Sequence, residues 1–433
     1  MIVTLVLLFT AGYVLITLEH TVNLNKTATA LLTGVACWAV YALSTPDTAL
    51  VTEHLSTTLT SVAEILFFLL GAMTIVELID AHEGFTLITD RIASRNIRTL
   101  LWIISLLSFG LSALLDNLTT AIVMVSVLRK LVRDPAQRRT MAGLVIIASN
   151  AGGAWSPIGD VTTTMLWIGG QVTTTNVARM LFIPSLVSLL VPLTVLTFQY
   201  KRNDDAFVPT AEEEGASRPF VTSAARRDRR LMLATGLGGM LWVPIFKTIT
   251  HLPPYVGMMG ALGLIWVMSE VIHKDKDEAE REQFSAAYAL SRIDAPSILF
   301  FLGILLAVGS LEATGILQGL ATQLNESVGN LDLIVLLIGL ASAVVDNVPI
   351  VAAAIGMYDL SVYPIDSKLW EFLAYCAGTG GSILVIGSAA GVAVMGMERL
   401  EFGWYLRHIS WLALLGYVAG ALVYLLEFEL MHP

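Results

Sequence analysis

Apolar runs of about 18 residues or more recur along this chain, a length that spans the hydrocarbon layer of a bilayer when the run is helical. Charged residues make up 14% of the 433 residues and hydrophobic residues 55%. Soluble domains carry about 25% charged residues. Lipid offers backbone polar groups no hydrogen-bond partners, and the runs lack the alternation of barrel strands. The sequence therefore predicts an all-α polytopic membrane protein and no enzyme.

The hydropathy pattern predicts about ten full crossings. We place them at 2–18, 28–43, 60–79, 140–169, 179–198, 231–247, 255–273, 296–313, 371–396 and 409–427. The first run has no basic segment before it and no small-residue cleavage site after it, so we expect a retained helix and not a signal peptide. Cys37 and Cys376 both lie in apolar runs and indicate no disulfide framework.

A short polar motif occurs twice inside apolar sequence. SALLDN at 112–117 recurs as SAVVDN at 342–347, with four of six residues identical. The apolar arm after each acid-amide pair has about 11 to 13 residues, too short at about 1.5 Å per residue to cross a layer roughly 30 Å thick. The pattern predicts re-entrant hairpins at 99–130 and 331–357, with the Asp-Asn pairs near their tips.

Basic residues gather in alternate loops. Of 25 Lys and Arg residues, only Arg179, Lys247 and Lys368 fall in the opposite set of loops. Positive loops face the cytoplasm, so we expect both termini outside. In this layout the first hairpin begins and ends at cytoplasmic loops, and the second begins and ends at external loops. The two halves therefore have opposite orientations in the membrane.

Further matches keep nearly the same spacing as the motif. Glu77 pairs with Glu312, and the Gly-Gly pair at 152–153 pairs with the one at 380–381. Inverted repeats with interrupted helices indicate a secondary transporter with its binding site near the membrane midplane. We expect N-terminal scaffold helices (1–59), a first repeat (60–198) with broken helix 140–169, a cytoplasmic linker with two bridging helices (199–293), a second repeat (294–397) with broken helix 371–396, and a C-terminal helix (398–433).

Polar side chains cluster at the hairpin tips and at the helix breaks. The first half offers Ser112, Asp116, Asn117, Asn150, Asp160, Thr162 and Thr163, and the second offers Ser342, Asp346, Asn347, Thr379, Ser382 and Ser388. Carboxylate, amide and hydroxyl oxygens are hard donors suited to hard cations such as Na⁺ or Li⁺. Neutral half-helix N-termini favour an anionic substrate instead, but the intramembrane aspartates oppose it.

Other roles remain open for these residues. Asp160 precedes three threonines and suits a helix cap, and Asn117, Asn150 and Asn347 suit hydrogen bonds between helices. The serines and threonines also fit ordinary helix packing in membranes. Glu64, Glu77 and Glu312 lie near predicted helix ends, where an interfacial role competes with proton relay. The linker charges indicate a solvated surface.

Taken together, these motifs resemble sodium/proton antiporters of the NhaD type in the ion transporter superfamily. The resemblance rests on the two hairpin motifs, on SNAGG at 149–153 and on PIGDVTTT at 157–164. It implies exchange of cytoplasmic Na⁺ or Li⁺ for external protons across a bacterial cytoplasmic membrane, and a homodimer with scaffold and transport domains. The resemblance also implies that the cation site is formed by Ser112, Asp116, Asn117, Asn150, Asp160, Thr162, Thr163, Ser342, Asn347 and Ser382.

The preferred hypothesis is therefore an antiporter without a cofactor. Asp116 and Asp160 would carry cation and proton, and Asp346 would be their partner from the other half. A low dielectric favours the neutral form of a carboxylate, so each aspartate would hold a proton or a metal ion in turn. The alternative is a Na⁺-coupled carboxylate or oxyanion symporter on the same scaffold. A channel-like pore or a non-transporting scaffold would leave inverted broken repeats with buried acids unexplained.

Overall fold

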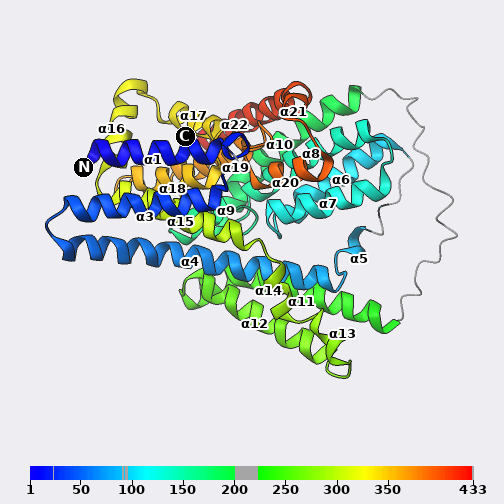
Figure 1. Cartoon of the computed structure of the whole chain (residues 1–433). Coiled ribbons are helices and arrows are strands. Elements are labelled where there is room, and N and C mark those ends of the chain that lie inside the picture. The colour runs from blue at the N-terminus through cyan, green and yellow to red at the C-terminus, as the bar shows by residue number, and fades with distance from the viewer. Residues whose placement is uncertain (23, 90–91, 93–95, 200–222, 432–433) are drawn as a thin grey trace.

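The computed structural model describes residues 1–22, 24–89, 92, 96–199 and 223–431. Within these residues the chain forms helices and loops and no strand (Figure 1), which confirms the all-α prediction. Most of the predicted linker, 200–222, lies outside the described residues.

Helices follow one another along the whole described chain. In order, they are α1 (Ile2–Thr17), α2 (Glu19–Val22), α3 (Lys26–Ser44), α4 (Thr48–Ala81), α5 (Thr86–Thr89), α6 (Ile97–Ser112), α7 (Asn117–Leu131), α8 (Pro135–Ala154), α9 (Val161–Ile168), α10 (Thr174–Gln199), α11 (Ser223–Thr250), α12 (Pro254–Ile272), α13 (Glu278–Glu282), α14 (Ala286–Arg292), α15 (Ala295–Ala313), α16 (Ile316–Val328), α17 (Leu331–Ala341), α18 (Asn347–Met357), α19 (Lys368–Gly380), α20 (Ala389–Glu398), α21 (Phe402–His408) and α22 (Ser410–Met431).

Seven helices of the described chain are long and apolar enough to cross a membrane, or up to eight if the bent pair α16 and α17 is one span. They are α3, α4, α10, α11, α12, α15 and α22. The multi-pass prediction is thereby confirmed. The predicted crossing at 60–79 is longer than expected, because the side chain of Asp47 caps two backbone amides and starts α4 at Thr48. The amphipathic α16 was not predicted.

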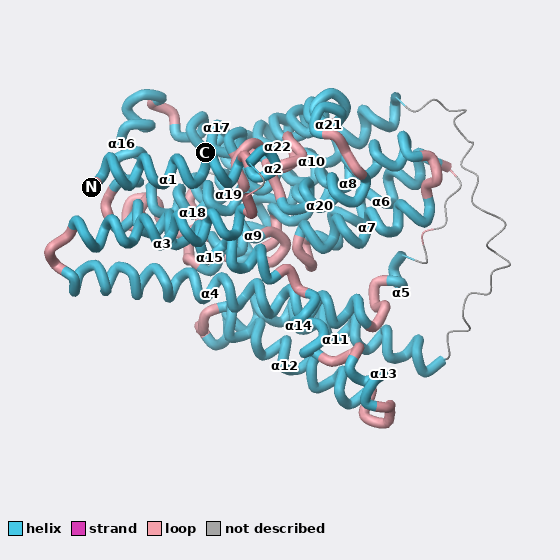
Figure 2. Tube along the Cα trace, in the orientation of Figure 1, coloured by secondary structure: helices cyan, strands magenta, loops and turns pink. Residues whose placement is uncertain are grey.

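Both predicted broken crossings are interrupted. The run 140–169 is divided into α8 and α9 by a loop at 155–160, and 371–396 into α19 and α20 by a loop at 381–388. Figure 2 shows loop segments beside α9 in the middle of the helical layer and not only at its ends. Backbone without helical pairing is tolerated at such depth only where protein or a cavity surrounds it.

Both motifs occupy a turn between two helices. The first lies between α6 and α7, and the second between α17 and α18. At about 1.5 Å per residue, the 11 residues of α18 reach only about 16 Å. That length agrees with a hairpin arm. The re-entrant path itself stays a prediction.

The helices pack in two groups. One contains α1, α3, α4, α11, α12 and α15, in which α3 packs along α15 and α4 along α12. The other contains α6 to α8, α10, α17, α19, α20 and α22, in which α10 packs along α22 and α17 along α19. In Figure 1 the long helix α4 separates α11 and α12 from the rest of the molecule. The half-helices α9 and α18 contact both groups.

The same close contact recurs in the two halves. A Cβ on Gly152 would lie 2.2 Å from the Phe109 carbonyl oxygen, and one on Gly380 would lie 2.1 Å from that of Gly339. Each glycine thus lets the backbone of a broken helix touch the backbone of a hairpin. Ser112 donates to the Ser149 carbonyl at 2.6 Å, and Ser342 to the Ala377 carbonyl at 3.3 Å. The sequence repeat therefore corresponds to a repeated packing unit.

Candidate cation site

All three candidate aspartates begin short helices. The side chain of Asp116 accepts from the Thr119 amide at the start of α7, that of Asp160 from the Thr162 amide at the start of α9, and that of Asp346 from the Val348 amide at the start of α18. Aspartate suits this position because its carboxylate satisfies amides that lack an intrahelical partner. The capping role proposed for Asp160 is present, and it extends to the other two.

Asp160 is the centre of a buried polar network. Its side chain is almost fully buried, since the residue is 1% exposed. Oδ1 accepts from the Thr162 amide at 2.8 Å and from the Thr162 hydroxyl at 2.6 Å. Oδ2 accepts from Asn117 Nδ2 at 2.7 Å. The same nitrogen donates to Asn150 Oδ1 at 3.0 Å. The structure therefore joins the first hairpin tip, α8 and α9 around one carboxylate.

Ser388 connects this network to the other half. Asn150 Nδ2 donates to Ser388 Oγ at 3.0 Å, and the same oxygen accepts from the Gly391 amide to cap α20. Ser388 occupies the repeat position of Asp160, because each follows an Ile-Gly pair at the second helix break. The sequence pattern placed Ser388 among the polar residues of the second half but did not assign it to the cation site. The repeat was the signal that could have assigned it.

Asp116 and Asp346 lie at the edge of the network. Both are half-buried, and the carboxylate of Asp116 accepts from the Thr119 hydroxyl at 2.6 Å. Asp160 interacts electrostatically with both of them. Asp346 also interacts with Lys26, at the start of α3. The two outer acids are thus close enough to Asp160 for their charges to act on it.

The remaining predicted oxygens hold the helix breaks. Thr163 donates to the Ala154 carbonyl, Thr379 to the Tyr375 carbonyl and Ser382 to the Thr379 carbonyl. Ser112 and Ser342 hold the hairpins in the same way. Their hydrogens are committed to backbone groups, while the oxygen lone pairs stay available. Asn347 is buried at the start of α18.

A cavity of about 550 Å³ lies beside α9 and α18. Its lining includes Met165 of α9 and Ala352 of α18, together with Glu53 and Glu64 of α4 and Glu312 of α15. Each of the two half-helices starts at one of the candidate aspartates. Glu64 and Glu312, whose roles the sequence left open, therefore face a cavity on the side that the loop charges predict to be external.

The charges of the site favour a cation. Four helix N-termini meet the polar network or flank it, those of α7, α9, α18 and α20, and each carries roughly half a positive charge. Together they amount to roughly two positive charges, which three ionised aspartates exceed by roughly one. One monovalent cation or one proton would balance that excess. A site without the acids would attract anions.

A polytopic helical fold with interrupted helices around buried acids is the architecture of a membrane transporter. Residues 13–370 match the family described as citrate transporter, CitMHS. The chain belongs to this family.

Two plant proteins and one bacterial protein are similar to this chain over nearly its whole length. Sodium/proton antiporter 2 of Arabidopsis thaliana is 47% identical over 97% of this chain and 98% of its own length. Sodium/proton antiporter 1 of the same plant is 48% identical over 99% of this chain and 73% of its own length. The Na⁺/H⁺ antiporter NhaD of Vibrio cholerae is 32% identical over 97% of this chain and 90% of its own length. The predicted NhaD-type resemblance is confirmed. Because the relatives come from a plant and from bacteria, the bacterial membrane stays a prediction.

Proposed function

We propose that this protein is a secondary antiporter that exchanges Na⁺ or Li⁺ for H⁺ across the membrane. The observation that carries the proposal is the buried Asp160 carboxylate, held by Asn117 and Thr162 and flanked by Asp116 and Asp346. The names of the plant and bacterial relatives support the same ion pair.

The exchange follows from competition for one carboxylate. A dehydrated alkali ion needs several oxygens, which Asp160, the Asn150 amide and the Thr162 hydroxyl offer within one network. When the ion leaves, the excess negative charge in a medium of low dielectric favours proton uptake by an aspartate. The protein then carries either the ion or the proton, and a separate coupling device is unnecessary.

The packing supports alternating access by relative movement of two helix groups. The group around α4 and α15 would be the scaffold, and the group around α10 and α22, with the hairpins, the moving unit. The cavity beside α9 and α18 would be the external route to the site. We further propose a homodimer formed through the scaffold, which chemical cross-linking in native membranes tests.

A transport assay tests the antiport directly. Everted vesicles are energised to an acidic interior, and the pH gradient is followed with a fluorescent dye. Adding Na⁺ or Li⁺ should collapse the gradient in the unaltered protein, whereas Asp160→Asn or Asp116→Asn should remove the response at equal membrane levels. Asp359→Asn, in an exposed loop, is the matched control and should respond like the unaltered protein. A response of Asp160→Asn equal to that of the unaltered protein would refute the proposal.

The second candidate is a Na⁺-coupled carboxylate symporter. The observation that raises it is the description of the matching family as citrate transporter. The same vesicles, with citrate or a dicarboxylate added together with Na⁺, separate the two functions. Carboxylate uptake without gradient collapse would decide for the symporter.

A further inference from the structure

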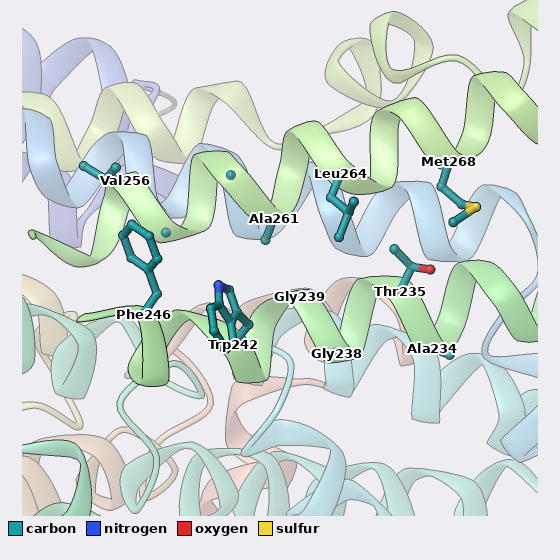
Figure 3. Close-up of a pocket in the computed structure, with 12 residues that line it drawn as sticks. Ala234, Thr235, Gly238, Gly239, Trp242, Phe246, Val256, Ala261, Leu264 and Met268 are labelled. Carbon is teal, nitrogen blue, oxygen red and sulfur yellow. The ribbon is translucent and has the colours of Figure 1, made fainter. Parts of the chain in front are cut away.

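A groove between α11 and α12 lies outside the cation site. Figure 3 shows it from the side, with Trp242 and Phe246 rising from α11, and Leu264 and Met268 descending from α12. The groove has a volume of about 750 Å³. Its lining is apolar apart from the hydroxyl of Thr235 and the indole N–H of Trp242.

The floor of the groove is open because glycines face it. Gly238 of α11 and Gly260 of α12 are exposed, and a Cβ on either would meet no atom within 4 Å. Large side chains stand at its rim, with Trp242 exposed by 48% and Leu264 by 57%. The two helices thus touch at Gly239 and Ala261 and leave an open groove along the exposed side of that contact.

The groove runs along most of the membrane-spanning part of α12. On α12 its lining runs from Val256 to Met268, which corresponds to about 18 Å along the helix axis. One leaflet of hydrocarbon is about 15 Å thick, half of the usual core. An acyl chain that enters at the Met268 end, near the last turn of α12, would therefore occupy the part of the groove that belongs to one leaflet.

A basic residue marks one end. Met268 also lines a second cavity, which continues the groove to Arg227 and Asp228 at the start of α11. Arg227 is exposed and is in none of the ion pairs within the described chain, whereas Arg229 pairs with Glu83. Arg230, one turn from Arg227, is also exposed, so two arginines outweigh the single carboxylate of Asp228. This end lies on the side that the loop charges predict to be cytoplasmic.

We propose that the groove binds one anionic phospholipid, with an acyl chain along the Gly238 and Gly260 floor and its phosphate at Arg227. The apolar channel selects hydrocarbon, and the guanidinium selects a negative headgroup over a zwitterionic one. The contact is in the leaflet where anionic lipid and basic segments meet. This site is separate from the aspartates, so the proposal does not depend on the transported ion.

Native mass spectrometry of the purified full-length protein tests the proposal without a transport readout. Phosphatidylglycerol and phosphatidylcholine are titrated separately into the detergent-solubilised protein, and bound lipid is counted. We expect one tight site that prefers phosphatidylglycerol. Arg227→Gln should weaken phosphatidylglycerol binding about fivefold, since one basic residue near a membrane surface contributes about that factor. Phosphatidylcholine binding should weaken less, because its choline cation offsets the charge of the phosphate.

Filling the groove should weaken the binding of both lipids. Gly260→Leu places a side chain in the channel, and we expect a loss of about tenfold or more for each lipid, with an unchanged size-exclusion profile. Gly263→Leu on the same helix is the control, because Gly263 is exposed, has open space around it and does not line the groove. Lys274→Gln is the matching charge control.

Three outcomes would overturn the proposal. The first is the absence of a tight lipid site in the unaltered protein. The second is that Gly263→Leu or Lys274→Gln weakens binding as much as its partner variant. The third is an oxidative cross-link between two copies through Thr235→Cys, which would show that a second copy occupies the groove.

Discussion

At the scale of single residues, Asp160 is the group that the surrounding chain constrains most. Thr162 supplies two hydrogen bonds to the same carboxylate oxygen, one from its amide and one from its hydroxyl. The amide bond is fixed by the start of α9, whereas the hydroxyl bond depends on the side chain alone. Thr162 therefore allows the side-chain contribution to the site to be measured separately.

Removing that hydroxyl should weaken cation binding without preventing folding. Thr162→Val keeps the shape of the side chain but loses the bond to Oδ1 and a hydroxyl oxygen near the ion. A lost hydrogen bond to a charged group is worth about 1.5 kcal/mol or more, so we expect the Na⁺ concentration at half-maximal antiport to rise about tenfold. Thr162→Ser should restore most of the affinity in the same vesicle assay. Equal values for the Val variant and the unaltered protein would remove Thr162 from the site.

At the scale of elements, the half-helices are positioned by glycine contacts between backbones. These contacts fix how far each hairpin tip lies from its helix break. A methyl group at Gly152 or Gly380 would overlap a carbonyl oxygen of the facing hairpin. The backbones would have to separate, and the capping aspartates would move with them.

Both glycines should therefore be equally intolerant of substitution. We expect Gly152→Ala and Gly380→Ala each to destabilise the protein by about 1 to 3 kcal/mol, the usual cost of overpacking. Thermal melting of the purified protein measures the effect. Gly110→Ala is the control, since Gly110 has open space around it, and alanine favours a helix by about 1 kcal/mol over glycine. If the three variants melt alike, the close contacts do not limit packing.

The adjoining ends of α4 and α12 hold a pair of buried histidines that the sequence did not bring together. His82 Nδ1 lies 2.7 Å from the Leu78 carbonyl oxygen and must donate to it. Its Nε2 then accepts from His273 Nε2 at 2.9 Å, while Phe284 stacks on the His273 ring at 4.2 Å. A further proton would direct two N–H groups at each other.

Acid should weaken this junction. Burial lowers the pKa of His82, and burial, with Lys276 and His82 nearby, lowers the pKa of His273 from 6.5 to about 4. The unfolded chain therefore binds more protons than the folded chain between these values, so stability falls as the pH drops through that window. We expect the melting temperature to decrease between pH 7 and about pH 5. His273→Phe should reduce this dependence, and an unchanged pH profile would contradict the assignment.

At the scale of the whole molecule, polar contacts tie the helix group around α4 to the half-helix α9. One of them comes from Lys247, near the end of α11, whose Nζ donates to the Trp167 carbonyl at 2.8 Å and lies 4.6 Å from the Trp167 ring centroid. Trp167 belongs to α9, which begins at Asp160. If α9 moves with the group around α10 and α22 during transport, this contact has to break.

Loss of the lysine contact should then change rate more than affinity. We expect Lys247→Gln to raise the maximal antiport rate at least about threefold, because the contact broken during movement is a hydrogen bond from a charged group. The half-maximal Na⁺ concentration should stay unchanged, since Lys247 does not touch the cation network. Lys247→Arg keeps the charge and should behave like the unaltered protein. A shift in Na⁺ affinity with an unchanged rate would place Lys247 in the site instead.

The sequence by itself determined the membrane class, the two hairpin motifs and the interrupted helices. These properties follow from local composition, because a long apolar run has to be helical in lipid and polar residues beside a Gly-Gly pair mark each break. Proline alone does not mark a break, since Pro184, Pro192 and Pro244 lie inside continuous helices. The repeat also predicted which polar residues correspond between the two halves. The sequence can also predict that helices start at Asp116, Asp160 and Asp346, because capping depends only on neighbouring residues.

Only the tertiary structure decided which oxygens meet. Asn117, Asn150 and Asp160 converge because α7, α8 and α9 pack around one point, and Ser388 joins them because α20 reaches the same point. The histidine pair and the groove between α11 and α12 likewise depend on helices that are distant along the chain or lie side by side. Contacts of this kind depend on packing geometry, which a pattern along one chain does not contain.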